Sequence, residues 1–175
     1  PYWDLYKNGN TSDKDMFRFT GKAIWNVNQH FKLQGTIGTD INNMNFEDFI
    51  AKTTPGTPAG KLTEQIFNNR TLNAELLALY SNSWGDLDIN ATAGGNIFKV
   101  NNKTITNVGL NQQMNGIKNI MNYEEQTTRE NMYKKQISSL YASASLGYRH
   151  TYYLEATLRG DKSSTLPVSN NTYVY

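Results

Sequence analysis

The chain has 175 residues, with 17 Lys and Arg against 15 Asp and Glu, so its formal charge is +2. This near balance, with no basic run longer than Lys134-Lys135, gives no electrostatic footprint for nucleic acid. Cysteine is absent, which excludes disulfides, zinc–thiolate sites and a thiol nucleophile, and no apolar stretch approaches the ~20 residues that a membrane-spanning helix needs.

The first strand pattern runs through Met16–Val27, where apolar residues alternate with polar ones. Successive side chains of a strand point to opposite faces, so the alternation predicts one apolar face and one polar face. A tight turn is expected at Asn28-Gln29-His30, and the pattern resumes over Phe31–Asn42. The apolar positions of this hairpin are Phe17, Phe19, Gly21, Ala23, Trp25, Val27, Phe31, Leu33, Gly35, Ile37 and Ile41.

Two further hairpins repeat the alternation. The second covers Thr71–Phe98 and turns near Ser83–Asp86, and the third covers roughly Tyr133–Asp161 and turns at Gly147–His150. Gly94-Gly95 lacks the strand-then-helix setting of a phosphate loop, so we interpret this pair as strand glycines that allow a bend or a close approach.

Long polar connections are predicted between the hairpins, over about Asn43–Arg70, over about Lys99–Met132 and after Asp161. Short turns at one end and long loops at the other are typical of outer-membrane barrels. The sequence therefore predicts an all-β fold: an antiparallel transmembrane β-barrel segment, about six strands of a larger barrel, with short periplasmic turns and long extracellular loops. Apolar side chains would face lipid and polar ones an aqueous lumen.

Aromatic residues lie beside all three short turns, which favours a membrane–water boundary there because such rings have an apolar body and a polar end. The alternative is a soluble β-sandwich whose rim holds the same rings. Six strands cannot close a barrel of this style, so further strands are expected elsewhere. The aromatic residues are Trp25, Phe31, Tyr80, Trp84, Tyr148 and Tyr152.

The segment Tyr153–Pro167, with the sequence YLEATLRGDKSSTLP, is followed by Asn170–Tyr175. It resembles the barrel of SusC/RagA-type TonB-dependent transporters of Bacteroidota, which carry an Arg-x-Asp-x-Ser-Ser strand-to-loop element and then an aromatic return. Pro1-Tyr2-Trp3 is similar to an Asn-Pro-Tyr-Trp element of the same barrels. We therefore expect residues 1–175 to be a partial barrel domain, with the plug and the TonB box not present in this chain.

The resemblance implies energised import of nutrients across the bacterial outer membrane, mostly of oligosaccharides and in some members of peptides. It also implies three partners: TonB, acting through the missing N-terminal part, a SusD-like surface lipoprotein that closes over the barrel, and outer-membrane lipid. No cofactor is implied. A passive porin and a soluble carbohydrate-binding β module remain the alternatives.

Catalysis has little support in the residues. His30 and His150 lie in predicted short turns without further metal ligands nearby, so no metal site is expected. Glu124-Glu125 are adjacent, and adjacent carboxylates seldom converge on one glycosidic bond. We expect no enzyme activity.

Two groups of residues are the candidates for function. Substrate contact is predicted for loop aromatics, because sugar rings bind aromatic faces beside amide and carboxylate groups; these are Phe46, Phe49, Phe67, Tyr123 and Tyr173. The alternative for these rings is packing of the loops or contact with the lipoprotein. Charges on the polar strand faces are expected to face the lumen and the plug; these are Arg18, Lys22, Asp40, Glu75, Asp88, Glu155 and Arg159.

Overall fold

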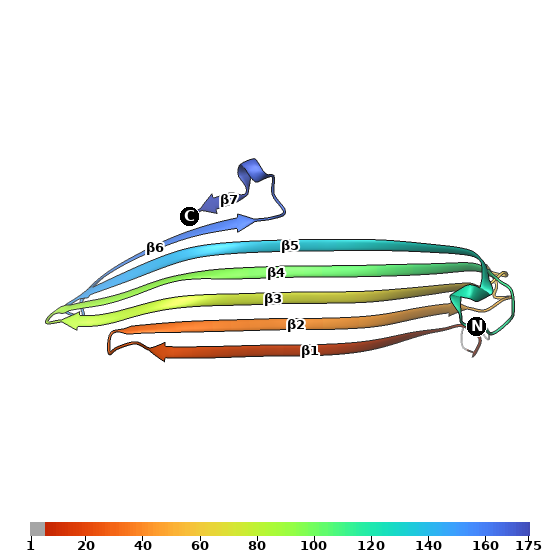
Figure 1. The fold of residues 1–175 in the computed structure, drawn as a ribbon, viewed down its shortest axis with the longest axis horizontal. Helices are drawn as coiled ribbons and strands as arrows, with labels where there is room; N and C mark the ends of the chain where they lie inside the picture. Colours follow the sequence, from red (N-terminus) through yellow and green to blue (C-terminus); the bar gives the residue numbers. More distant parts are fainter. Residues whose placement is uncertain (1–5) are drawn as a thin grey trace. The chain divides into compact units, whose positions relative to one another are not determined.

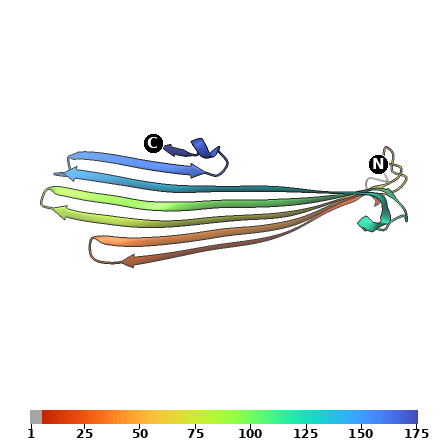
Figure 2. The same ribbon diagram turned by 45° about the horizontal axis from the view of Figure 1, so that its top comes forward.

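The computed structural model describes residues 6–175, so the Pro1-Tyr2-Trp3 element lies outside the described residues. The chain forms one sheet in which the strands follow one another in sequence order (Figure 1; Figure 2). The all-β fold is confirmed, and each of the three predicted hairpins is present. The elements are β1 (Gly9–Asn26), β2 (Phe31–Ile50), β3 (Lys61–Trp84), β4 (Leu87–Gln112), η1 (Ile120–Asn122), β5 (Tyr123–Tyr148), β6 (Tyr152–Ser163), η2 (Val168–Asn170) and β7 (Thr172–Val174).

The strands are much longer than the alternating pattern predicts, and the prediction of long loops over residues 43–70 and 99–132 is wrong. β2 continues to Ile50, β3 begins at Lys61, and β4 and β5 leave only residues 113–122 between them. The backbone ladder needs no apolar side chains to continue, since its hydrogen bonds come from neighbouring strands. The apolar alternation therefore ends well before the strands do.

The tight turn between β5 and β6 uses two residues in the left-handed region, Arg149 with φ 51° and His150 with φ 50°. Such a conformation is unfavourable for residues other than glycine and persists where surrounding contacts hold it. Arg149 donates from its backbone N–H to the Asp86 carbonyl oxygen at 2.7 Å and pairs with the Asp86 carboxylate at 2.8 Å. His150 Nδ1 lies 3.2 Å from Asp88 Oδ2. The β3–β4 turn thus holds the β5–β6 turn.

The register of β5 against β6 separates the two faces. Leu140 pairs with Gly160, Ala142 with Leu158 and Leu146 with Leu154, all at alternating positions on one face. The intervening pairs are polar, including Tyr141 with Arg159 and Ser145 with Glu155. The predicted division into an apolar and a polar face is present in this hairpin.

The chain divides into two compact units, each drawn from several strands. Unit 1 comprises residues 1–17, 41–70 and 101–133, and unit 2 comprises residues 18–40, 71–100 and 134–175. Unit 1 has a small apolar core of Phe49, Ala51, Leu62 and Tyr123, with Ile120 packed against it. Among the described residues of unit 2, no apolar side chain is buried.

At two positions a neighbouring group lies so close to the backbone that only glycine fits. A Cβ on Gly109 would lie 2.6 Å from Cγ of Tyr123, so the ring of the unit 1 core lies directly against this backbone. In unit 2, a Cβ on Gly94 would lie 2.6 Å from Leu77 Cδ2 and 2.8 Å from the Leu76 carbonyl oxygen. The close-approach interpretation of Gly94 is therefore confirmed.

Among the described residues, no helix is both long enough and apolar enough to cross a membrane.

Candidate functional site

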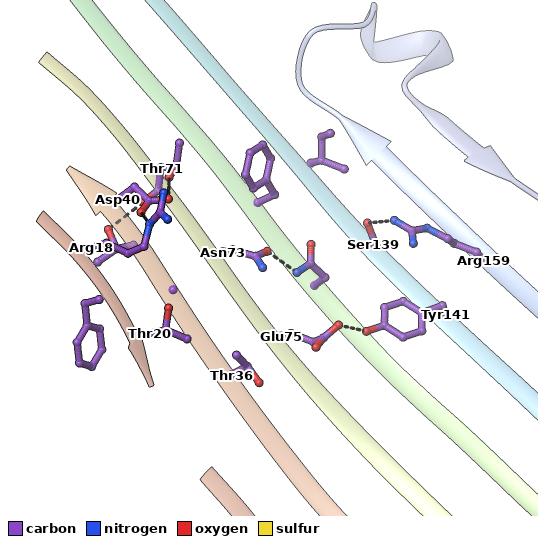
Figure 3. Close-up of a pocket in the computed structure, with 16 residues that line it drawn as sticks. Arg18, Thr20, Thr36, Asp40, Thr71, Asn73, Glu75, Ser139, Tyr141 and Arg159 are labelled. Atoms are coloured by element: carbon purple, nitrogen blue, oxygen red, sulfur yellow. Dashed lines mark hydrogen bonds and ion pairs between the residues drawn. The ribbon is translucent and has the colours of Figure 1, made fainter. Parts of the chain in front are cut away.

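The polar face of unit 2 contains a cavity of about 820 Å³, which crosses β1 to β6 (Figure 3). Alternation along each strand places every second side chain toward it, so β2 contributes Thr36 and Asp40 while β3 contributes Thr71, Asn73 and Glu75. Figure 3 shows the labelled side chains rising from the same side of the sheet. The lining residues are Arg18, Phe19, Thr20, Thr36, Gly38, Thr39, Asp40, Thr71, Asn73, Glu75, Asn96, Phe98, Ile137, Ser139, Tyr141 and Arg159.

One end of the cavity is built on an ion pair between Arg18 of β1 and Asp40 of β2. The second carboxylate oxygen of Asp40 accepts a hydrogen bond from the Thr71 hydroxyl at 3.3 Å. Thr39 donates to the Thr71 carbonyl oxygen at 2.9 Å, which ties β2 to β3. Both oxygens of the Asp40 carboxylate are therefore already bonded within the protein.

The middle of the cavity is formed by two cross-strand hydrogen bonds (Figure 3). Asn96 Nδ2 of β4 donates to Asn73 Oδ1 of β3 at 2.6 Å. The Tyr141 hydroxyl of β5 donates to the Glu75 carboxylate of β3. These bonds fix the four side chains, and they leave the second carboxylate oxygen of Glu75 and part of each amide for a ligand.

Arg159 of β6 organises the other end. Its guanidinium lies 5.8 Å from the centre of the Tyr141 ring and donates to the Ser139 hydroxyl at 3.4 Å. Its Nε donates to Asp161 Oδ1 at 3.0 Å, and Asp161 also accepts from the Tyr175 hydroxyl. The planar guanidinium can both stack and bond, which lysine could not do in the same position. The segment that resembles the transporter family thus contributes directly to this cavity.

The formal charges that line the cavity cancel, because Arg18 and Arg159 are balanced by Asp40 and Glu75. The remaining polar lining consists of neutral hydroxyl and amide groups beside the rings of Phe98 and Tyr141. Such a surface offers hydrogen-bond donors, acceptors and aromatic faces. It is suited to a neutral ligand with many hydroxyl groups.

Four of the seven charged residues predicted to face a lumen line this one cavity: Arg18, Asp40, Glu75 and Arg159. The other three do not line it. Asp88 accepts from the Ser83 hydroxyl at 2.6 Å beside the turns, and Glu155 pairs with Ser145 in the β5–β6 register. Lys22 lies on β1, four residues beyond Arg18, and is exposed.

Sequence reasoning missed the neutral members of the cavity. Asn73, Asn96, Ser139 and Tyr141 occupy the same alternating positions as the charges on their strands, so the signal that identifies them is strand parity. Their pairing across three strands depends on register, which the alternation within a single strand does not fix.

The predicted substrate-binding aromatics do not lie in loops. Phe46 and Phe49 belong to β2, Phe67 to β3, Tyr123 to β5 and Tyr173 to β7. Phe49 and Tyr123 are buried in the unit 1 core, Phe46 and Phe67 are half-buried, and Tyr173 is exposed. The structure does not bring these five rings to one site, and their contact with substrate stays a prediction.

Tyr123 has an unusual environment within unit 1. Its side chain is buried, and its hydroxyl has no hydrogen-bond partner among the described residues. Burial, together with the charges of Glu47 and Glu64, raises the pKa of Tyr123 to about 12. The ring is a packing group whose hydroxyl stays protonated at neutral pH.

Within residues 6–175, no group of three or more His, Asp or Glu side chains is arranged to hold a metal ion. His30 lies 3.2 Å from the Ser81 carbonyl oxygen of β3, and His150 pairs with Asp88 of β4, so each histidine connects its turn to a neighbouring strand. Glu125 accepts from Asn111 at 2.9 Å at the start of β5.

No protein-family profile matches this chain, and no curated protein sequence matches it. Solved structures do. A chain of the RagAB peptide transporter superimposes with a TM-score of 0.90 at 16% identity, covering 98% of this chain and 20% of its own length. The RagAB peptide importer in its open-open state gives 0.89 over 98% of this chain, and in its closed-closed state 0.88 over 95%, each at 16% identity.

This chain therefore has the fold of part of those transporter chains and spans about a fifth of their length.

Proposed function

We propose that residues 1–175 are a segment of the barrel wall of a SusC/RagA-type, TonB-dependent importer in the bacterial outer membrane. The single observation that carries this proposal is the match of nearly the whole chain to RagAB transporter chains at a TM-score of 0.90. The Arg159–Asp161 element and the aromatic return to Tyr175 support the same assignment from the sequence side.

The chemistry of unit 2 supports a place in a membrane. From Leu140 to Tyr148 on β5, paired with Tyr152 to Gly160 on β6, nine positions alternate between the two faces. A tilted strand crosses the hydrocarbon core with about 9–11 residues. Leucines on the apolar face are strongly exposed, with Leu140 at 73% and Leu158 at 60%. Contact with hydrocarbon would be favourable for these side chains, because the exposure of contiguous apolar surface to water is unfavourable in free energy.

The edges of the sheet support a larger barrel. β1 and β7 are the first and last strands in the order, so each has one side without a partner within the described residues. Unpaired backbone groups are strongly unfavourable in hydrocarbon, and a closed barrel removes them. The closing strands, the plug and the TonB box would belong to parts of the protein other than these residues.

Oligosaccharides are the substrates we propose. The formal charges of the cavity lining sum to zero, its Asp40 carboxylate is paired with Arg18, and its free groups are hydroxyls, amides, aromatic rings and one oxygen of the Glu75 carboxylate. A sugar chain matches that inventory better than a ligand with charged termini does. The barrel would work without chemistry on the substrate, with TonB supplying the energy and a SusD-like surface lipoprotein delivering the ligand.

Peptides are the second candidate, because the structures that this chain resembles are named as a peptide transporter and a peptide importer. A peptide could use the same amide and hydroxyl groups through its backbone. It would need its termini and charged side chains to be neutralised by groups elsewhere in the barrel.

The test uses the full-length gene in its own host. Deletion of the gene should abolish growth on one class of oligosaccharide. The wild-type gene should restore this growth in a strain with TonB and should fail to restore it in a strain without TonB. An Asn73→Ala/Asn96→Ala variant should weaken uptake of that sugar while the protein remains in the outer membrane. Growth lost on peptides instead would select the second candidate. Uptake that continues without TonB would support a passive porin instead of an energised importer. Extraction of the protein without detergent would refute the membrane barrel.

A further inference from the structure

The apolar face of unit 2 carries a continuous groove, lined by residues of β2 to β7. Three adjoining hollows make it up, of about 640, 680 and 480 Å³, and each shares residues with the next. The first two share Leu76 and Leu140, and the second and third share Ala78 and Leu158. The groove therefore runs in the strand direction, from the level of Lys162 to that of Ala156.

The groove exists because small residues form its floor between larger apolar walls. Ala93, Gly95, Ala142 and Gly160 lie between the leucines of the neighbouring positions. Lys162 and Ala156 are six residues apart on β6, which corresponds to about 20 Å at roughly 3.3 Å per residue. One leaflet contributes about 15 Å of hydrocarbon, half of the ~30 Å core. An acyl chain lying along the groove would fit that length.

One end of the groove is basic. Lys162 lines it there, beside Ser138 and Thr172. Alternation places Lys99, two residues after Ile97, and Lys134, four residues before Ser138, on the same face. All three lysines are exposed, and none has an ion-pair partner among the described residues. The carboxylates that border this end, Glu75 and Asp161, stand at strand positions of the opposite face, where Glu75 accepts from Tyr141 and Asp161 from Arg159.

We propose that this groove binds a phosphorylated lipid of the surrounding bilayer, with an acyl chain along the alanine and glycine floor and its phosphate at Lys162, flanked by Lys99 and Lys134. The proposal rests on the membrane location proposed above. The occupant is assigned by the combination of an apolar channel of acyl length and unpaired positive charge at one end only. A second protein would need neither feature.

The experiment measures lipid retention by the detergent-solubilised full-length protein, using native mass spectrometry after addition of phosphatidylglycerol or phosphatidylcholine. Wild type should retain phosphatidylglycerol in preference. A Lys99→Gln/Lys134→Gln/Lys162→Gln variant should lose that preference, by about fivefold for each lysine, since one basic residue near an anionic lipid surface contributes about that factor. Inorganic phosphate alone should not displace the lipid.

Two controls separate the causes. A Lys32→Gln/Lys135→Gln variant removes charge at positions of opposite parity, next to Phe31 and Lys134, and should keep the preference. Ala142→Leu fills the groove floor and should reduce retention of both lipids alike. Equal retention of both lipids by wild type, or an unchanged preference in the triple variant, would overturn the lipid site. If the full-length protein inserts in the outer membrane and imports its substrate, that result leaves the proposed function intact.

Discussion

The two units of this chain handle their apolar residues in opposite ways. Unit 1 buries Phe49, Ala51, Leu62 and Tyr123 in a core of its own. Unit 2 has no buried apolar side chain among the described residues and exposes Leu140, Leu158 and their neighbours on one face. The first arrangement is that of a structure stable in water, and the second that of a surface which needs an apolar surrounding. The same strands therefore surround a buried apolar core in unit 1 and present their apolar side chains on the surface in unit 2.

The sharpest test of the comparison is truncation of the unit 1 core. Tyr123→Ala should lower the free energy of unfolding of unit 1 by about 3–5 kcal/mol, because a large buried ring is replaced by a cavity. Hydrogen exchange should show faster amide exchange around Phe49 and Leu62 and little change around Leu158. Equal acceleration in both units would contradict their separate stabilisation.

A charge on the apolar face tests unit 2. Leu158→Arg should destabilise the full-length protein in lipid vesicles by about 2–4 kcal/mol, the effect of a cation on the lipid-facing side near the middle of the bilayer. Thr157→Arg is the matched control, since Thr157 pairs with Ser143 on the polar face. Urea titration in vesicles gives both values. Similar losses for the two variants would remove the assignment of the faces.

Gly109→Ala should destabilise unit 1 by about 1–3 kcal/mol, because the new methyl group would lie 2.6 Å from the Tyr123 ring. The companion variant Gly109→Ala/Tyr123→Leu removes the ring that causes the clash. Its loss should be smaller than the sum of the two single losses, as for residues in contact. Strict additivity, measured by hydrogen exchange of the unit 1 core, would mean that the two positions do not meet.

The Tyr123 hydroxyl gives a pH test. The pKa in the folded chain is about 12 against 10 for an ordinary tyrosine, so unfolding favours loss of the proton. The contribution of the neutral ring is complete below pH 10 and is lost as the pH rises from 10 to 12. Tyr123→Phe should be close to neutral at pH 7, because the hydroxyl has no partner, and should remove this alkaline loss. An unchanged alkaline profile in Tyr123→Phe would assign the loss to other groups.

The smallest effect is expected on the polar face of unit 2. Arg18 and Asp40 form an ion pair whose side chains are 70% and 42% exposed. A double-mutant cycle with Arg18→Ala and Asp40→Ala should give a coupling free energy close to zero, as exposed pairs do. A coupling as large as that of a buried ion pair would show that this pair is shielded from water in the full-length protein.

Much of unit 2 could be predicted from the sequence, and most of unit 1 could not. Alternation predicts the hairpins and their turns because apolar and polar residues alternate along each strand of unit 2. In unit 1 both faces of most strands are polar, so residues such as Asn102, Thr104 and Thr106 carry no such signal although they belong to β4. For the same reason the sequence pattern predicts the rings of Phe49 and Tyr123 in loops, whereas they belong to β2 and β5.

The amino-acid sequence alone determined the all-β class, the approximate places of the turns after β1, β3 and β5, and the separation of polar from apolar side chains in unit 2. These features are local, since the direction of a side chain depends only on its position along a strand. Only the tertiary structure decided where the strands end, which rings form a core, and which polar groups meet in the cavity. Those features require partners more than twenty residues away, as Arg18 with Asp40 or Glu75 with Tyr141, and a pairing register that no single strand contains.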